Sequence, residues 1–298
     1  ELLQNLMVVG LYTALGYSLF GLELAFMVNA AIMIILGVVT WFSLPRQTLL
    51  KSGDDTTSAN REVLAGMRVT LRLPEIWLAG AVGFCVYMIY TALPFFLTYL
   101  NEIYALPVLA VSIFGIASTS GGRIAIALPS GFIAQRFFGG PTGGMGFGMT
   151  LVALLALSMM ALPIGPTTMW PAMALMLLIT FTVFFMRPLY FAPFGEMGLP
   201  PRFSGSVIAI AAFIIYLPTS FAYLLWGVLL DNNEGATGYR YLFALMAVVA
   251  VVGWFLARSL NQRIRSGAAE RIAEKIQAMD TELGLQGEEK TLSQLIDK

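Results

Sequence analysis

The sequence predicts an all-α polytopic membrane protein with eight transmembrane helices. Of its 298 residues, 58% are hydrophobic and only 11% are charged, whereas a soluble chain is typically about 25% charged because its surface must face water. The apolar residues are gathered in runs of about twenty, the length that a helix needs to cross a bilayer. Alternating segments of about ten residues, which would indicate a β-barrel, do not occur.

Eight apolar runs follow one another along the chain. They cover residues 2–19, 24–44, 76–100, 108–132, 143–162, 169–190, 206–230 and 241–260. Most are apolar around their whole circumference, as expected of helices that face lipid or lie inside a bundle. The polar and charged stretches between and after the runs then predict four parts: two helices in residues 1–44, a cytosolic linker in 45–75, a six-helix bundle in 76–262 and a cytosolic amphipathic tail in 263–298.

Basic residues indicate how the runs are oriented. The connectors after the second, fourth and sixth runs and the end of the eighth run carry ten Lys and Arg residues, and the opposite connectors carry one, Arg240. The basic side of a membrane protein faces the cytoplasm, so we expect both termini there. In the tail, Ile272, Ile276, Met279 and Leu283 recur at helical spacing. We interpret this helix as a structural tail on the bundle or membrane surface, with a partner site as the alternative.

Composition excludes several classes of protein. With 17 basic and 17 acidic residues the net charge is zero, so no nucleic-acid partner is expected. The single cysteine, Cys85, has no second cysteine to pair with, and the chain has no histidine. The common zinc sites and Ser-His or Cys-His catalysis are therefore excluded. We expect no metal, no cofactor and, because the runs lack clustered acid–base groups, no enzymatic activity.

Arg123 is the strongest candidate for a binding residue. A charge inside a span is costly and therefore indicates function, and Arg123 lies about 20 Å from either end of its run at 1.5 Å per residue. Before it come Ser118, Thr119, Ser120 and two glycines, whose hydroxyls and missing side chains suit a ligand cavity. An arginine there offers five donors to a carboxylate or phosphate. The alternative is a structural arginine paired with a carboxylate, although no predicted span carries one at mid-depth.

Arg187 also lies inside a run, and Pro188 and Pro193 follow it. Proline interrupts helical hydrogen bonding, and broken helices near the midplane often mark transporter sites. A long arginine side chain can also reach the interface from such a position. Arg187 is therefore a candidate substrate contact. The alternative, which its position favours, is a role in a gate or at the membrane interface.

Two further groups complete the candidate residues. Tyr87, Tyr90 and Tyr216 lie at mid-depth, where their hydroxyls can bind a polar solute or serve only in packing. Arg136, Glu196 and Arg202 fall at the cytosolic end of the runs. Opposite charges on moving helix ends can hold one face of a transporter closed, and ordinary interfacial charges explain this group equally well.

Several motifs resemble those of the major facilitator superfamily. The stretch 122–136 is similar to the family's span-eight signature, a G-R…G…D-R pattern, with Gln135 in the place of the usual Asp. The stretch 187–200, followed by Gly205, resembles the junction of spans ten and eleven, and 227–231 with 238–239 continues the pattern. The resemblance covers nearly the whole chain and is nearest to bacterial porters of sugar phosphates and related organic anions. It implies that the eight runs are spans five to twelve and that Arg123 contacts substrate. Because Gln135 stands where the family usually has Asp, the charged form of the family's gate is in doubt.

These features predict the C-terminal two-thirds of a secondary transporter in a bacterial inner membrane, a monomer that moves a small polar solute, an organic anion, by alternating access. A proton or sodium ion is the expected coupling partner. The chain begins with Glu1, just before a span, so we expect a piece of a longer protein, with a genuine eight-span protein as the alternative. The rival function is an eight-span scaffold or binding subunit that transports nothing.

Overall fold

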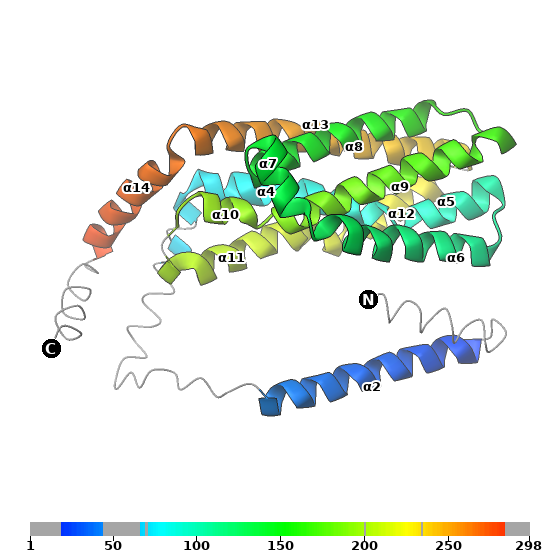
Figure 1. Ribbon diagram of the computed structural model, residues 1–298, viewed down its shortest axis with the longest axis horizontal. Coiled ribbons are helices and arrows are strands. Elements are labelled where there is room, and N and C mark those ends of the chain that lie inside the picture. The colour runs from blue at the N-terminus through cyan, green and yellow to red at the C-terminus, as the bar shows by residue number, and fades with distance from the viewer. Residues whose placement is uncertain (1–18, 44–65, 69–70, 200, 234, 284–298) are drawn as a thin grey trace.

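The computed structural model describes residues 19–43, 66–68, 71–199, 201–233 and 235–283, and every regular element in them is helical (Figure 1). Six helical segments of this part are long and apolar enough to cross a membrane. The all-α class is thus confirmed, but six spans are found where eight were predicted. The first predicted run, 2–19, lies outside the described residues except for its last position. The six segments are Pro74–Tyr104, Val108–Ala127, Pro141–Ala161, Pro166–Glu196, Ser204–Asp231 and Ala236–Arg265.

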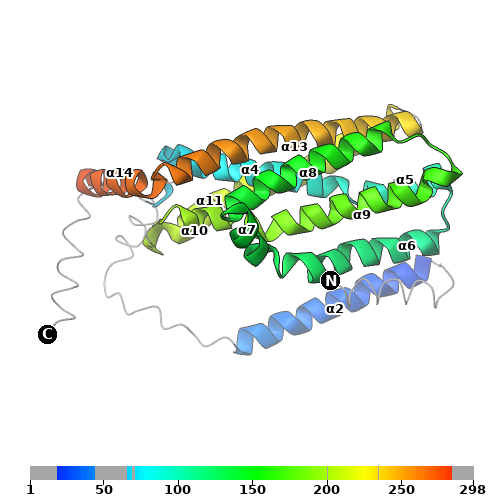
Figure 2. The same cartoon turned by 45° about the horizontal axis from the view of Figure 1, so that its top comes forward.

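The second predicted run forms helix α2 (Leu19–Ser43). From Met27 onward its side chains are mostly exposed; Trp41 and Phe42 each show more than four-fifths of their surface (82% and 81%). Figure 1 draws α2 apart from the bundle that the other helices form, and Figure 2 shows it on the side of α6. Because α2 covers little of its apolar surface with protein, we do not count it among the packed spans.

Prolines divide three of the six spans. A proline lacks the backbone N–H that an α-helix needs and its ring clashes with the preceding turn, so helical pieces meet at Pro94, Pro188 and Pro218. The expected interruption after Arg187 is confirmed, and no break was predicted at Pro94 or Pro218. The pieces are α4 (Pro74–Ala92) and α5 (Phe95–Tyr104); η3 (Pro166–Thr168), α9 (Met169–Met186), η4 (Arg187–Leu189) and α10 (Ala192–Glu196); and α11 (Pro201–Tyr216), η5 (Leu217–Ser220) and α12 (Ala222–Asp231).

The span that carries Arg123 departs from α-helical geometry. Helix α6 (Val108–Ile116) continues into two π-helical segments, η1 (Ala117–Gly121) and η2 (Arg123–Ala127), and α7 (Ser130–Phe138) follows Pro129. A π-helical turn accommodates one residue more than an α-helical turn and is found frequently at functional sites. The hydropathy of residues 108–132 predicted one regular helix, so this irregularity is a new feature.

Helices α4, α8 (Pro141–Ala161) and α13 (Ala236–Arg265) form the most tightly packed part of the bundle. They meet at Gly253 of α13, where an added Cβ would lie 2.8 Å from the sulfur of Met149 and 3.0 Å from the Cβ of Cys85. Small residues at such points let membrane helices approach closely. This core fixes α4, whose other face carries the tyrosines described below.

Helix α14 (Ala268–Leu283) is the amphipathic helix that the tail sequence predicted. Gly267, with φ +81°, turns the chain between α13 and α14, and Figure 1 shows α14 beyond the end of the bundle. Ile272 and Ile276 are almost completely buried, so this part of the apolar face packs against protein. The side chains of Met279 and Leu283 lie outside the described residues.

Candidate functional site

Two arginines from different spans meet at Tyr90, near the middle of the α4–α5 span. Nη2 of Arg123 donates a hydrogen bond to the Tyr90 hydroxyl over 3.2 Å. The guanidinium of Arg187 lies over the Tyr90 ring, 4.1 Å from its centroid, which is the geometry of a cation–π interaction. Tyr90 therefore contacts two positively charged side chains, Arg123 at its hydroxyl and Arg187 on its ring face.

The local structure explains how each arginine reaches Tyr90. Arg123 is the first residue of η2, and Arg187 is the first residue of η4, where Pro188 ends α9. The guanidinium of Arg123 also lies 5.2 Å from the ring centroid of Phe184 on α9. Gly122 makes this approach possible, because a Cβ there would come within 3.0 Å of Phe184.

The two glycines before Arg123 differ in what surrounds them. Nothing lies within 4 Å of a Cβ built on Gly121, but Phe181 and Phe184 occupy the space beside Gly122. The interpretation of both glycines as cavity-forming is therefore wrong for Gly122. Its missing side chain serves helix packing.

Four tyrosines form a connected group beside the second arginine, and we call Tyr87, Tyr90, Tyr190 and Tyr216 the central tyrosine cluster. The ring of Tyr87 lies 5.2 Å from that of Tyr90 and 4.9 Å from that of Tyr216. The hydroxyls of Tyr190 and Tyr216 are 2.9 Å apart and share a hydrogen bond. Three of the four were candidates from the sequence, and the fold brings them together with Arg187, which also lies 5.9 Å from the Tyr87 ring.

A cavity of about 140 Å³ lies beside this cluster. Tyr90 forms part of its wall, and so do the hydroxyl-bearing residues Ser118, Thr119 and Thr180. Ser118 and Thr119 belong to the hydroxyl-bearing stretch that the sequence analysis associated with a cavity, whereas Thr180 was missed. Ser120 is not part of the wall: it is buried, and its hydroxyl has no hydrogen-bond partner among the described residues.

The predicted gate residues lie at the end of the bundle from which α14 extends. The carboxylate of Glu196 accepts a hydrogen bond of 2.6 Å from the hydroxyl of Thr142, in the first turn of α8. A carboxylate is favourable at a helix N-terminus because of the helix dipole. Arg136 is exposed on α7, and within the described residues no ion pair joins it to Glu196. The side chain of Arg202 lies outside the described residues, so the gate stays a prediction.

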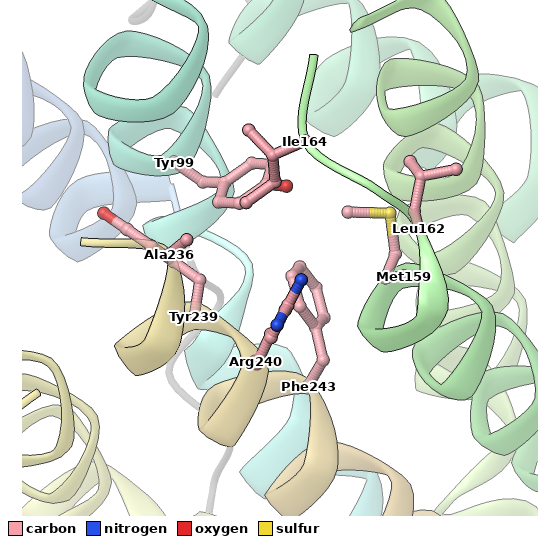
Figure 3. Close-up of a pocket in the computed structure, with 8 residues that line it drawn as sticks. All are labelled: Tyr99, Met159, Leu162, Ile164, Ala236, Tyr239, Arg240 and Phe243. Atoms are coloured by element: carbon pink, nitrogen blue, oxygen red, sulfur yellow. The ribbon is translucent and has the colours of Figure 1, made fainter. Parts of the chain in front are cut away.

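A second group of tyrosines lies near the opposite end of the bundle, and we call Tyr99, Tyr104 and Tyr239 the end tyrosine cluster. Tyr239 donates a 2.7 Å hydrogen bond to the carboxylate of Glu102, and its ring packs edge-on to Tyr99 at 4.9 Å. Figure 3 shows Tyr99, Tyr239 and Arg240 around a small cavity. Its volume of about 10 Å³ is close to the minimum that one water molecule needs, so no solute fits there.

The chain matches known membrane proteins. The family model described as Major Facilitator Superfamily matches residues 6–223. "Inner membrane protein YihN" of Escherichia coli (strain K12) is 27% identical over 265 residues, which cover 89% of this chain and 63% of that protein. "Inner membrane protein YqcE" of the same strain is 27% identical over 248 residues, which cover 82% and 58%. The chain thus spans about three-fifths of the length of these relatives.

Solved structures of a xylose transporter also resemble the chain. A proton:xylose symporter, XylE, bound to 6-bromo-6-deoxy-D-glucose, gives a TM-score of 0.47 at 14% identity and covers 76% of this chain and 54% of its own. The inward-open form of XylE from E. coli gives 0.45 at 16% identity, with 76% and 56% covered.

Proposed function

The chain belongs to the major facilitator superfamily, and from this premise we propose that it forms part of a secondary active transporter that moves a small organic anion by alternating access. Transporters built from such helical repeats bind substrate near the bilayer midplane, where helices are often broken. The broken spans of this chain, and the arginines within them, fit that arrangement. Because the chain covers only part of its relatives' length, the activity belongs to a protein longer than this chain.

The observation that carries the proposal is the meeting of Arg123 and Arg187 at Tyr90. A guanidinium binds carboxylate and phosphate through parallel N–H donors. Two guanidiniums lie against one tyrosine, and their combined positive charge favours an anionic solute. In this proposal Arg123 contacts the anion beside Thr119 and Ser120, and Arg187, Tyr87, Tyr90 and Tyr216 line its path.

The remaining features of the sequence complete the proposal. Arg136, Glu196 and Arg202 form the inner gate, with Glu196 anchored to α8 through Thr142. Residues 1–44 end one helical bundle, 45–75 link it to the bundle 76–262, and 263–298 form a cytosolic tail. The protein works as a monomer in a bacterial inner membrane with both termini of this segment in the cytoplasm, and a proton or sodium ion drives it.

The test uses the full-length protein that contains this chain. Thermal-shift measurements with sugar phosphates, carboxylates and neutral sugars identify the solutes that bind, because a ligand of the folded state raises its apparent stability. We expect anions to bind and Arg123→Ala to abolish that binding. The matched control is Arg258→Ala, since Arg258 also stacks on an aromatic ring, that of Trp254 at 5.7 Å, but lies outside the site. Binding of neutral sugars alone, or unchanged affinity of Arg123→Ala for every anion, contradicts the proposal.

A further inference from the structure

The cavity beside Tyr90 lies next to the arginine site but is chemically distinct from it. The Tyr90 hydroxyl accepts the hydrogen bond from Arg123, and the same side chain forms part of the cavity wall. Thr119 and Arg123 are four residues apart on one helix, so the cavity and the guanidinium are neighbours. Tyr90, Thr119 and Thr180 each lie near the middle of their spans. A solute held by Arg123 therefore has this space within reach.

The hydroxyls in the cavity wall present acceptors. A serine or threonine hydroxyl has a single hydrogen and two lone pairs. Ser118 and Thr119 both donate their hydrogen to the carbonyl of Gly115, over 3.1 and 2.6 Å. Thr180 donates its hydrogen to the carbonyl of Met176 over 2.8 Å. The lone pairs of these three oxygens remain, so this part of the wall favours a group that donates hydrogen bonds.

The rest of the wall is apolar and none of the described residues that line the cavity is charged. Leu93, Pro94, Phe96, Leu97 and Phe114 supply carbon surface. The volume of about 140 Å³ is close to the ~150 Å³ of an engineered cavity that binds benzene. The space therefore accommodates roughly six non-hydrogen atoms of a larger solute. An ionised group placed here would lose its hydration without gaining a partner charge, which is unfavourable.

We infer that the solute is an organic acid with one acidic end and a hydroxylated carbon body, and that part of this body, about six non-hydrogen atoms, occupies the cavity while the acidic end meets Arg123. The carbon surface of the solute packs on the apolar wall, and its hydroxyls donate to Ser118, Thr119 and Thr180. A dicarboxylate is disfavoured because its second charge would enter the uncharged cavity. The inference rests on the proposed function and narrows the anion to hydroxylated acids with one acidic group.

The test compares six-carbon acids that differ in one property each. Gluconate and glucuronate are hydroxylated monocarboxylates, hexanoate lacks the hydroxyls, and adipate carries a second carboxylate. Titration calorimetry on the full-length protein in lipid nanodiscs measures their dissociation constants. We expect gluconate or glucuronate to bind at least about tenfold more tightly than hexanoate and adipate, the factor that one hydrogen bond to an otherwise unsatisfied group provides.

Two valine variants locate the hydroxyl contact. Thr180→Val keeps the shape of the side chain and removes the acceptor, so we expect it to weaken the hydroxylated acids about five- to tenfold and to leave hexanoate unchanged. Thr182→Val is the matched control. Thr182 is also buried on α9 and donates to a carbonyl in the preceding turn, that of Leu178 at 2.7 Å, but it does not line the cavity.

The outcomes separate this inference from the proposed function. If adipate or hexanoate binds as tightly as the hydroxylated acids, and Arg123→Ala abolishes binding of all of them, the inference is wrong and the anion transporter stands. If Thr180→Val and Thr182→Val change the dissociation constants of the hydroxylated acids equally, the cavity does not bind the solute body and the inference is also wrong. If none of the four acids binds, both the inference and the proposed anion specificity are overturned.

Discussion

The central and end tyrosine clusters use the same side chains in different surroundings. In the end cluster, Tyr239 donates to the carboxylate of Glu102, and the remaining space is about 10 Å³. In the central cluster, Tyr90 accepts from Arg123 and carries Arg187 on its ring. The cavity beside it is about fourteen times larger, at about 140 Å³.

The difference shows which features separate a packing cluster from the proposed binding site. Edge-to-face ring contacts occur in both clusters, Tyr99–Tyr239 in one and Tyr87–Tyr216 in the other, so they stabilise either region. In the end cluster the hydroxyl of Tyr239 donates to the carboxylate of Glu102. At the central cluster two positively charged side chains converge on Tyr90 beside a cavity of about 140 Å³.

After the loss of binding expected for Arg123→Ala, the largest expected effect comes from removing the second positive charge of the central cluster. We expect Arg187→Ala to lower the affinity for anions roughly 50-fold, about 2.3 kcal/mol, because a hydrogen bond to a charged group contributes ~1.5–3 kcal/mol. Titration calorimetry on the full-length protein measures the change. Arg240→Ala at the end cluster, where Arg240 lines the small cavity, serves as the control and should alter affinity little. Equal effects at the two positions would remove the distinction between the clusters.

The next effect tests packing behind the central cluster. Gly122→Ala places a Cβ 3.0 Å from Phe181 and Phe184, and such overpacking costs about 1–3 kcal/mol. We expect a lower Tm and, because Phe184 also contacts Arg123, weaker anion binding. Gly121→Ala has open space and is the control. A Tm unchanged by Gly122→Ala would show that the phenyl rings move aside easily.

A smaller effect separates the hydroxyl of Tyr90 from its ring. Tyr90→Phe keeps the ring under Arg187 and removes the acceptor of Arg123. We expect about tenfold weaker anion binding, close to 1.4 kcal/mol, with little change in Tm. In the end cluster, Tyr104→Phe removes a hydroxyl that pairs with Thr168 at 3.3 Å and should leave affinity unchanged. An equal loss of affinity in both variants would point to a general structural effect.

The smallest effect on anion binding and transport concerns the end cluster itself. Tyr239→Phe removes the donor to Glu102 and should destabilise the protein by about 1.5 kcal/mol, the low end of the range for a hydrogen bond to a charged group. Thermal melting measures the loss, and uptake of the anion should keep its rate. Slower uptake with unchanged melting would assign the end cluster a part in transport and remove the contrast drawn above.

Hydropathy was sufficient to locate the six packed spans because each must present apolar surface for the full width of the bilayer. The break after Arg187 could also be predicted, since Pro188 cannot continue an α-helix. Hydropathy did not indicate the π-helical segments 117–121 and 123–127, because a change in backbone hydrogen-bond register leaves the run equally apolar. The run 2–19 is untested, since nearly all of it falls outside the described residues.

The site was predictable only in part, for a physical reason. Arg123 and Arg187 stand out in a sequence because charge inside a span is costly. Their convergence on Tyr90 depends on the packing of three spans, so the sequence of no single span predicts it. Thr180 was missed because a hydroxyl that bonds to its own helix is tolerated in an apolar run and gives no comparable signal.

The π-helical stretch before and after Gly122 also bears on how chains of this kind can change in length. Losing one residue from a regular helix such as α8 rotates all later side chains by about 100° around the axis, which would misplace its packing face. Losing one residue between positions 117 and 127 converts a wide turn into an ordinary one and preserves the downstream register. Single-residue insertions and deletions among related sequences should therefore accumulate in this segment.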